Sequence, residues 1–280
     1  MSAHIPPDLS EKYRLLLDGL AGAHSCAVAF SGGVDSSVLA LAAWRALGHR
    51  ATAVYLTGAT STAAEQERAE RIASEIGIRL LVFRGKEFEE PEFVRNGADR
   101  CYHCKKVRFL QLTAWAKDNN VAWVVEGSNA DDADDYRPGS RAAAELGVRA
   151  PLAEAGLTKQ EIRQLARQEG LSNWDLPAAP CLATRIEYDL PITVGRLERI
   201  AAAEAFLAAQ GFSPVRVRLH DNGLARIEIA PEQIACFMDE KVRRDVNEKL
   251  TELGFTFVTL DMSGYQSGSM NRRIVQHREG

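Results

Sequence analysis

The sequence predicts an α/β protein: a doubly wound, mostly parallel sheet followed by a small C-terminal α+β domain. Four short apolar runs predict strands buried on both faces, at residues 25–30, 51–56, 79–83 and 121–126. The stretches between these runs carry apolar residues three and four positions apart, which is the spacing of helices. Strands that alternate with helices form right-handed crossover units and therefore a parallel sheet. After residue 191 the order changes to helix, strand, strand, helix, strand.

Each predicted element rests on its own pattern. Helical spacing follows the first strand at Val38, Leu39, Ala42 and Ala46, and follows the second at Ala69, Ile72, Ala73 and Ile76. The later elements are a helix at 196–209, alternating strands at 215–219 and 224–229, a helix from residue 231 and a strand at 255–260. A connector at 174–190 contains two prolines and Cys181. We therefore predict two domains, residues 1–190 and 191–280.

Composition describes an ordinary globular protein. Of 280 residues, 46% are hydrophobic and 26% are charged, which argues against a disordered or collagen-like chain. No apolar run approaches the ~18 residues of a membrane span, and the first residues lack the order of a signal peptide. We expect a cytoplasmic protein without membrane contact. The net charge of −4 gives no overall attraction to nucleic acid, which makes nucleic acid an unlikely partner.

Five cysteines in such a chain favour reduced, metal-binding or catalytic thiols over disulfides. Cys26 lies inside the first strand and Cys236 within a late helix, so both are expected to be buried small hydrophobes. Cys101, Cys104 and Cys181 remain as candidates for chemistry.

A loop at the end of the first strand is the main candidate for a phosphate site. Residues 31–37 read Ser-Gly-Gly-Val-Asp-Ser-Ser and open a helix. Glycines allow close backbone approach, and the free N–H groups of a helix start bind anions. The predicted nucleotide-binding residues are Ser31, Gly32, Gly33, Asp35 and Ser36. The alternative is a tight turn in which Ser31 or Asp35 only caps the helix.

An acidic segment, residues 126–139, follows the strand at 121–126. Its four aspartates repel one another, a cost that Mg²⁺ bridging the phosphates of a nucleotide would offset. Asp131 and Asp132 are the predicted ligands. The alternative is a solvated acidic loop.

These segments resemble a known family. The loop lacks the Walker A lysine and is similar to the SGGxDS loop of the PP-loop ATP pyrophosphatases, whose fold is that of the adenine nucleotide alpha hydrolases. Further matches extend the resemblance to the LarE family over nearly the whole chain: EGSNADDADDYRPG, PCLATR at 180–185, VRVRLH at 215–220 and LARIEI at 224–229. The resemblance implies an ATP-dependent sulfurtransferase that adenylates the carboxylates of pyridinium-3,5-biscarboxylic acid mononucleotide. Their conversion to thiocarboxylates matures the nickel-pincer nucleotide cofactor of lactate racemase.

The resemblance also assigns the sulfur chemistry. Cys181 occupies the position of the family's sulfur-donating cysteine, which in the sacrificial version loses its own sulfur. Cys101 and Cys104 add a C-x-x-C, and three thiolates would hold a [4Fe–4S] cluster with one iron left for a transferable sulfide. Zinc bound with His103, or a redox or persulfide pair, is the alternative.

The substrate nucleotide is expected to be bound by basic residues. By resemblance these are Lys105, Arg185, Arg216 and Arg218, with the last two on one face of a strand. A solvent-facing strand with arginines reaching into water is the alternative. Glu204 and Glu228 match acidic metal-site positions of the family, or are surface glutamates.

Other functions stay open from sequence alone. A tRNA thiolase of the same superfamily could also carry three cysteines, but it needs a basic surface for RNA. An ammonia-using ligase would not need the cysteines, and an ATP-binding regulatory module would leave Cys181 without a role. The expected partners are ATP, Mg²⁺, the small nucleotide substrate, sulfide or another sulfur donor, and further copies of the chain as a homo-oligomer.

Overall fold

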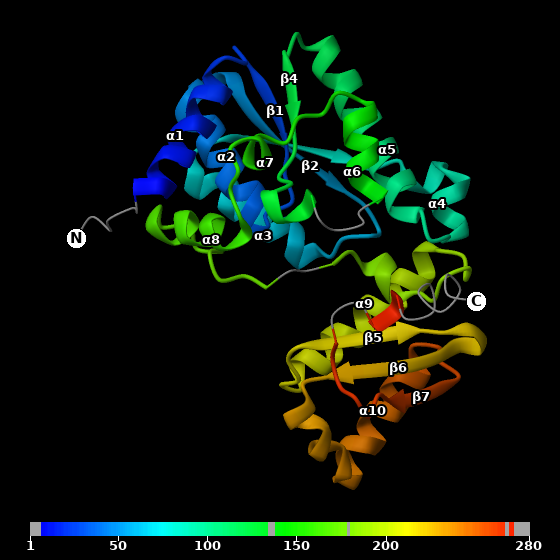
Figure 1. Ribbon diagram of the computed structural model, residues 1–280. Helices are drawn as coiled ribbons and strands as arrows, with labels where there is room; N and C mark the ends of the chain where they lie inside the picture. Colours follow the sequence, from blue (N-terminus) through cyan, green and yellow to red (C-terminus); the bar gives the residue numbers. More distant parts are fainter. Residues whose placement is uncertain (1–6, 134–137, 178–179, 267–268, 272–280) are drawn as a thin grey trace. The chain divides into compact units, whose positions relative to one another are not determined.

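The computed structural model describes residues 7–133, 138–177, 180–266 and 269–271. The chain forms two compact units (Figure 1): unit 1 comprises Met1–Glu90 and Cys101–Ala179, and unit 2 comprises Pro91–Arg100 and Pro180–Gly280. The sequence predicts a boundary at residue 190, whereas the main segment of unit 2 begins at residue 180, and a second segment comes from the first half of the chain. No helix of the described residues is long and apolar enough to cross a membrane.

Unit 1 is built on a parallel four-stranded sheet, as predicted. Its strands are β1 (Cys26–Ala29), β2 (Ala51–Thr57), β3 (Arg79–Arg84) and β4 (Trp123–Val125), in the order β3-β2-β1-β4. Val28 of β1 lies beside Ala53 of β2 on one side and Val125 of β4 on the other. The winding reverses between β1 and β4, and such a switch point is where α/β sheets bind ligands, at the carboxyl ends of the strands.

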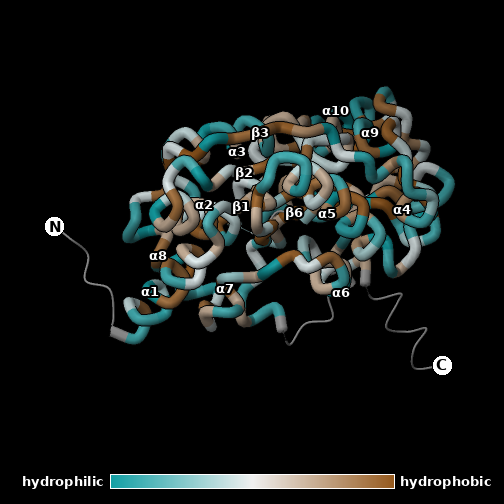
Figure 2. Tube along the Cα trace, turned by 90° about the horizontal axis from the view of Figure 1, so that it is seen from above, coloured by the Kyte–Doolittle hydropathy of each residue, from teal (hydrophilic) through white to brown (hydrophobic). Residues whose placement is uncertain are grey.

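Helices cover both faces of this sheet (Figure 1). One core contains side chains of α1 (Pro7–Ala21), α2 (Val34–Leu47), α3 (Ala63–Ile76) and α8 (Lys159–Gln168). A second core contains side chains of α5 (Arg100–Asp118) and α6 (Pro138–Glu145). Cys26 and Val28 belong to the first core and Ala27 to the second, as the alternation of a strand requires. Strands β1 and β2 are hydrophobic (Figure 2) and buried. The edge strand β3 is half-buried to exposed along its length, so the expectation that it is buried on both faces is wrong: it has a neighbouring strand on one side only.

Unit 2 contains the small α+β arrangement that the sequence predicts. The elements are α9 (Val194–Ala209), β5 (Val215–Leu219), β6 (Leu224–Ile229), the 3-10 helix η6 (Pro231–Met238), α10 (Glu240–Glu252) and β7 (Phe257–Leu260). β6 pairs with β5 in antiparallel and with β7 in parallel orientation. The parallel pairing follows because η6 and α10 carry the chain back along the sheet.

A segment from the first half of the chain, with α4 (Pro91–Arg95), belongs to unit 2. Asn96 is fully buried and has a left-handed backbone conformation with φ of 64°. Its amide donates hydrogen bonds to the carbonyls of Glu187 at 2.7 Å and Leu190 at 2.9 Å, and its side-chain oxygen accepts one from Arg100 at 2.6 Å. These bonds hold the segment against residues 187–192.

The two cysteines that were expected to be buried differ in their exposure to solvent. Cys26 is fully buried in β1, and burial raises the pKa of its thiol to about 12. Cys236 is exposed, so that expectation is wrong. The segment is a 3-10 helix rather than an α-helix, and it turns the next residue, Phe237, inward against Phe212.

Candidate active site

The loop at residues 31–37 lies at the carboxyl end of β1 and leads into α2. Gly32 has φ of +70°, and a Cβ added there would lie 2.9 Å from Cα of Ala69 in α3. Only glycine fits both the backbone and the space. Gly33 is the N-cap of α2 and no side chain caps the helix, so the helix start presents N–H groups without a capping side chain. This is the local structure of an anion site.

The hydroxyl groups of the loop brace its backbone. Ser36 and Ser37 donate to the carbonyl of Gly33 at 3.0 and 2.9 Å, and Ser31 accepts from the Gly33 N–H at 3.3 Å. Asn173, which the sequence analysis did not identify, is buried and donates to the Gly32 carbonyl at 3.0 Å. A second segment of unit 1, which contains Asn173, therefore stabilises the loop through hydrogen bonds to Gly32 and Ser37.

Asp35 and Asp131, predicted from separate segments, are both bonded to Lys159. The Lys159 ammonium group forms an ion pair with Oδ2 of Asp35, and its backbone N–H donates to Oδ2 of Asp131 at 2.8 Å. Oδ1 of Asp35 is buried and has no hydrogen-bond partner among the described residues. A buried carboxylate oxygen without a partner is costly unless a ligand satisfies it, and a divalent cation with bound phosphates suits it.

Lys159 was missed by the sequence analysis. It is the first residue of α8, behind Thr158, which forms a reciprocal capping box with Glu161. The Thr-x-x-Glu spacing predicts this helix start from sequence. The meeting of Lys159 with Asp35, 124 positions away, depends on the tertiary fold.

The acidic segment is described only in part. Asp131 and Asp132 lie in the 3-10 helix η3 (Ala130–Ala133), where Asp132 accepts from the N–H of Asn129 at 3.0 Å and Asp131 donates its own N–H to the Asn129 side chain at 3.0 Å. Asp134 and Asp135 lie outside the described residues. Gly127 packs so closely that an added Cβ would lie 3.0 Å from the backbone nitrogen of Ser36, which brings this segment to the start of α2.

Lys105 is bonded to the residue that directly follows β4. It extends from α5 and donates to Oε2 of Glu126, the residue after β4, at 2.9 Å. Cys101 and Cys104 lie on the same helix, one turn apart, with Cys101 exposed and Cys104 half-buried. No group of three or more His, Cys, Asp or Glu side chains in the described parts of the chain is placed to hold a metal ion. Cys101 and Cys104 belong to unit 1 and Cys181 to unit 2.

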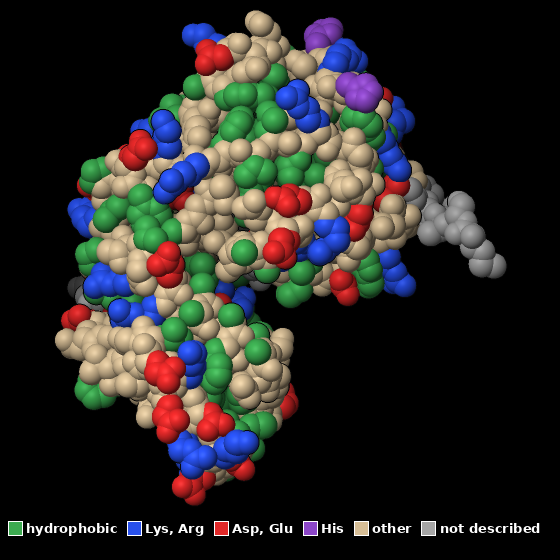
Figure 3. All heavy atoms as spheres, turned by 180° about the vertical axis from the view of Figure 1, so that it is seen from behind, with side chains coloured by type: hydrophobic (Ala, Val, Ile, Leu, Met, Phe, Trp, Pro, Cys, Tyr) green, Lys and Arg blue, Asp and Glu red, His purple; other side chains and the backbone are tan. Residues whose placement is uncertain are grey.

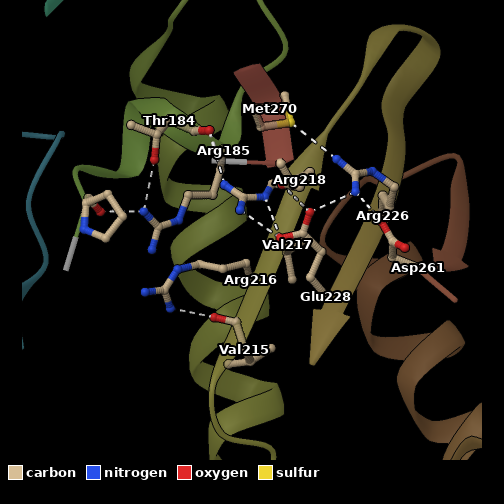
Figure 4. Close-up of polar contacts among 12 residues, drawn as sticks. Thr184, Arg185, Val215, Arg216, Val217, Arg218, Arg226, Glu228, Asp261 and Met270 are labelled. Carbon is tan, nitrogen blue, oxygen red and sulfur yellow. Dashed lines mark hydrogen bonds and ion pairs between the residues drawn. The ribbon is translucent and has the colours of Figure 1, made fainter. Parts of the chain in front are cut away.

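Within unit 2, Arg185 holds the segment that carries Cys181. Its Nη1 donates to the carbonyl of Pro180 and, at 3.1 Å, to that of Cys181, while Nε and Nη2 donate to Glu204 at 3.0 and 3.2 Å. Figure 4 shows Arg185 bonded to Thr184 as well. Arg185 is buried and Cys181 is exposed. The charge of Arg185 is therefore paired with Glu204, and its geometry fixes the backbone of the candidate sulfur-transferring cysteine.

Arg218 is also paired with a carboxylate. Its Nη2 donates at 2.7 Å to Glu228, which is fully buried in the central strand β6 (Figure 4). Glu228 accepts further bonds from Arg226 at 2.7 Å and Ser269 at 2.6 Å. Neither Glu204 nor Glu228 is a surface glutamate: both join the arginines of this cluster.

Arg216 differs from its two neighbours. It donates one bond, at 2.7 Å, to the carbonyl of Val215, its Nε is buried without a partner, and it has no ion pair among the described residues (Figure 4). Burial, followed by the positive charge of Arg185, lowers the pKa of Arg216 from its usual value. A guanidinium group stays charged at neutral pH all the same. An unpaired positive charge in this position is suited to an anionic ligand.

Comparisons with known proteins give a consistent result. Residues 19–90, which contain the loop at 31–37, match the family model of NAD synthase. An uncharacterized protein of Synechocystis sp. is 41% identical over 89% of this chain and 92% of its own length. The pyridinium-3,5-bisthiocarboxylic acid mononucleotide synthase of Lactiplantibacillus plantarum is 36% identical over 96% of both chains. A GMP synthase of Aeropyrum pernix is 30% identical over 64% of this chain and 38% of its own length. With a relative of that identity aligned over nearly its full length, the chain belongs to the LarE family of PP-loop proteins.

Proposed function

We propose that this protein is an ATP-dependent sulfurtransferase that converts the carboxylates of pyridinium-3,5-biscarboxylic acid mononucleotide to thiocarboxylates, in the synthesis of a nickel-pincer nucleotide cofactor. The observation that carries the proposal is Arg216, which has no acidic partner among the described residues and belongs to the same arginine cluster as Arg185, the residue that binds the backbone of the exposed Cys181. The same chain also has a phosphate loop. A regulatory ATP-binding module would need only the loop. The synthase activity of the L. plantarum relative fits both parts.

The residues of unit 1 would bind ATP. The N–H groups at the start of α2 suit the phosphates, and the free oxygen of Asp35 with Asp131 and Asp132 suits Mg²⁺. Lys159 would exchange its Asp35 partner for a phosphate oxygen once the cation is bound. Its positive charge then lies where negative charge develops during phosphoryl attack.

A carboxylate needs activation because oxide is a poor leaving group. In the proposed first step a substrate carboxylate oxygen attacks the α-phosphorus of ATP, pyrophosphate leaves, and an acyl-adenylate remains. In the second step a sulfur nucleophile attacks the carbonyl carbon, AMP leaves, and the carbon–sulfur bond is formed. Repeating both steps at the second carboxylate gives the bisthiocarboxylic acid.

Arg216 would bind the phosphate or a carboxylate of the substrate, because it is the arginine of the cluster without an acidic partner in the described residues. Arg185 and Arg218 would act mainly by shaping the site through Glu204 and Glu228. Lys105, bonded to Glu126, is the proposed substrate contact from unit 1.

Cys101, Cys104 and Cys181 are the proposed ligands of a [4Fe–4S] cluster, which would be held by their thiolates. The donor set fits iron, since all three are thiols outside disulfides, one turn of helix separates the first two, and Cys181 is exposed. When bound, such a cluster supplies an iron site for exogenous sulfide. The carbon–sulfur bond of Cys181 would then stay intact, in contrast to the sacrificial route.

The test combines nucleotide and iron analysis of protein purified without oxygen. We expect AMP and pyrophosphate formation that depends on the pyridinium mononucleotide, about four irons and four acid-labile sulfides per chain after reconstitution, and an unchanged chain mass after turnover. Adenylation of tRNA in place of the mononucleotide would overturn the function and indicate a tRNA thiolase. Loss of one H₂S from Cys181, ~34 Da, would replace the cluster with the sacrificial mechanism.

A further inference from the structure

Unit 2 contains a polar cavity that none of the proposed substrate residues lines. Its volume is about 160 Å³, and it lies between the start of α9 and the turn that joins β5 to β6. The lining residues are Leu190, Arg196, Arg199, Leu219, His220, Asp221, Asn222 and Gly223. The volume is well below the ~300–1,000 Å³ of pockets for drug-sized ligands, so a nucleotide is too large for it.

Two arginines give this cavity a positive lining. Arg196 donates to the carbonyl of Pro191, and Arg199 donates to that of Gly254 at 2.9 Å. Neither forms an ion pair with any residue that the structure describes. A guanidinium group has five N–H donors, so most donors of both remain available. The first turn of α9, which contains Arg196, adds the positive end of a helix dipole.

Two other polar side chains of the lining, His220 and Asp221, already form hydrogen bonds. Arg226 donates to Nε2 of His220 at 3.0 Å, so this nitrogen accepts and the ring proton lies on Nδ1, 3.3 Å from Glu187. Burial lowers the pKa of His220, which keeps the ring neutral. Asp221 accepts from the N–H of Asn222 at 2.8 Å. The lining therefore has two positive charges and one negative charge, and the arginines supply its charged donors.

We propose that this cavity is a binding site for a small phosphate-class oxyanion, separate from the nucleotide loop and from Arg216. Inorganic phosphate and pyrophosphate share the chemistry that two arginine forks recognise. Pyrophosphate is also a product of the proposed reaction. The site itself does not depend on that function, since its residues take no part in it.

The test uses the full-length protein and the ring signals of His220 in NMR, which are assigned by their loss in His220→Gln. Phosphate and pyrophosphate are added in separate titrations at constant ionic strength, with chloride as the balancing anion. We expect a saturable shift of the His220 signals with at least one anion, and the ratio of the two dissociation constants identifies the preferred one. Each arginine replaced by Gln should weaken binding about tenfold.

The matched variants separate this proposal from the function. The shift should persist in Asp35→Ala and Arg216→Gln and vanish in Arg196→Gln/Arg199→Gln, whose folding is checked by its melting temperature without anion. If the double variant does not fold, Arg196→Lys, which keeps the charge and loses the fork, should weaken binding. A shift that does not saturate, or that survives the loss of both arginines, would overturn the site. Asp35→Ala should still abolish AMP formation in every case.

Discussion

The ammonium group of Lys159 is paired with Oδ2 of Asp35, and the other oxygen of this carboxylate, Oδ1, has no partner among the described residues. Lys159→Ala removes a positive charge from the proposed phosphate site, and we expect AMP formation to fall about 10²- to 10³-fold, as it does for other preorganised donors. Lys12 is the matched control, because it is bonded to Glu161 of the same helix at 2.7 Å without contacting the loop. AMP release by Lys12→Ala should equal that of the parent. Equal losses in both variants would assign the effect to α8 as a whole.

Arg216 and Arg218 are two positions apart but should respond in opposite ways. Arg216→Gln should weaken binding of the pyridinium mononucleotide about tenfold or more without loss of stability, because it removes an unpaired charge. Arg218→Gln should cost about 1.5–3 kcal/mol of unfolding free energy, because Oε2 of the buried Glu228 loses its charged partner while Arg226 still pairs with Oε1. Calorimetric titration and urea unfolding measure the two effects. If Arg216→Gln is less stable than the parent, the charge of Arg216 stabilises the fold and is not free for a ligand.

The buried carboxyl of Glu87 should contribute to the loss of folding stability at low pH. It is fully buried and accepts from Arg108 and Thr60, both at 2.9 Å. Burial would raise the pKa of this carboxyl, but the Arg108 charge and the hydrogen bonds outweigh it and hold the pKa below its usual value. With a lowered folded pKa, the stabilisation is complete above the unfolded value of about 4.3 and is lost as pH falls through the folded one. In urea unfolding, Glu87→Gln should therefore reduce the pH dependence below about pH 5. If the unfolding free energy of Glu87→Gln depends on pH as steeply as that of the parent, this role of Glu87 is wrong.

At the scale of elements, the capping box of α8 holds Lys159 in place. Thr158→Ala removes the acceptor of the Glu161 N–H and should cost about 0.5–2 kcal/mol of stability. Because Lys159 follows directly, AMP formation should fall as well. Asp239→Ala removes the N-cap of α10 in unit 2 and should cost a similar amount while leaving AMP formation unchanged. If both variants adenylate equally well, the helix start does not position Lys159.

Elements with local causes could be predicted from sequence, and those with distant partners could not. The strand, glycine loop and helix at residues 26–47 follow from neighbouring residues, so their prediction is confirmed. The segment at 91–100 has no comparable signal, because Asn96 is fixed by carbonyls more than 90 positions away. Lys159 was missed for the same reason. Arg216 and Arg218 were predicted as a pair, and only the fold distinguishes the paired charge from the unpaired one.

At the scale of the whole molecule, the proposed cluster draws on both units. Cys101→Ala, Cys104→Ala and Cys181→Ala should each lose the absorbance and iron of the cluster, and should lose sulfur transfer while retaining adenylation, because the loop of unit 1 is intact. Cys236→Ala is the control, since this thiol is also exposed but lies outside the set. Full sulfur transfer by Cys101→Ala and Cys104→Ala would show that Cys181 acts alone.

The distribution of charged side chains over the surface is a second property of the whole molecule. On the face shown in Figure 3, lysine and arginine side chains alternate with aspartate and glutamate rather than forming a basic stripe. Binding of a polyanion such as tRNA relies on clustered positive charge and the release of counterions. The visible face has no basic stripe of the kind on which such binding relies.

Unit 2 takes its segment at 91–100 from between two parts of unit 1, which limits how the gene can be divided. A fragment that ends at residue 179 keeps Asn96 but loses the carbonyls of Glu187 and Leu190 that its side chain binds. A fragment that begins at residue 180 loses Val94, whose carbonyl accepts from the N–H of Ile192 at 2.8 Å. No single crossover in recombination can exchange unit 2 intact. A graft of unit 2 onto another PP-loop protein therefore requires both segments.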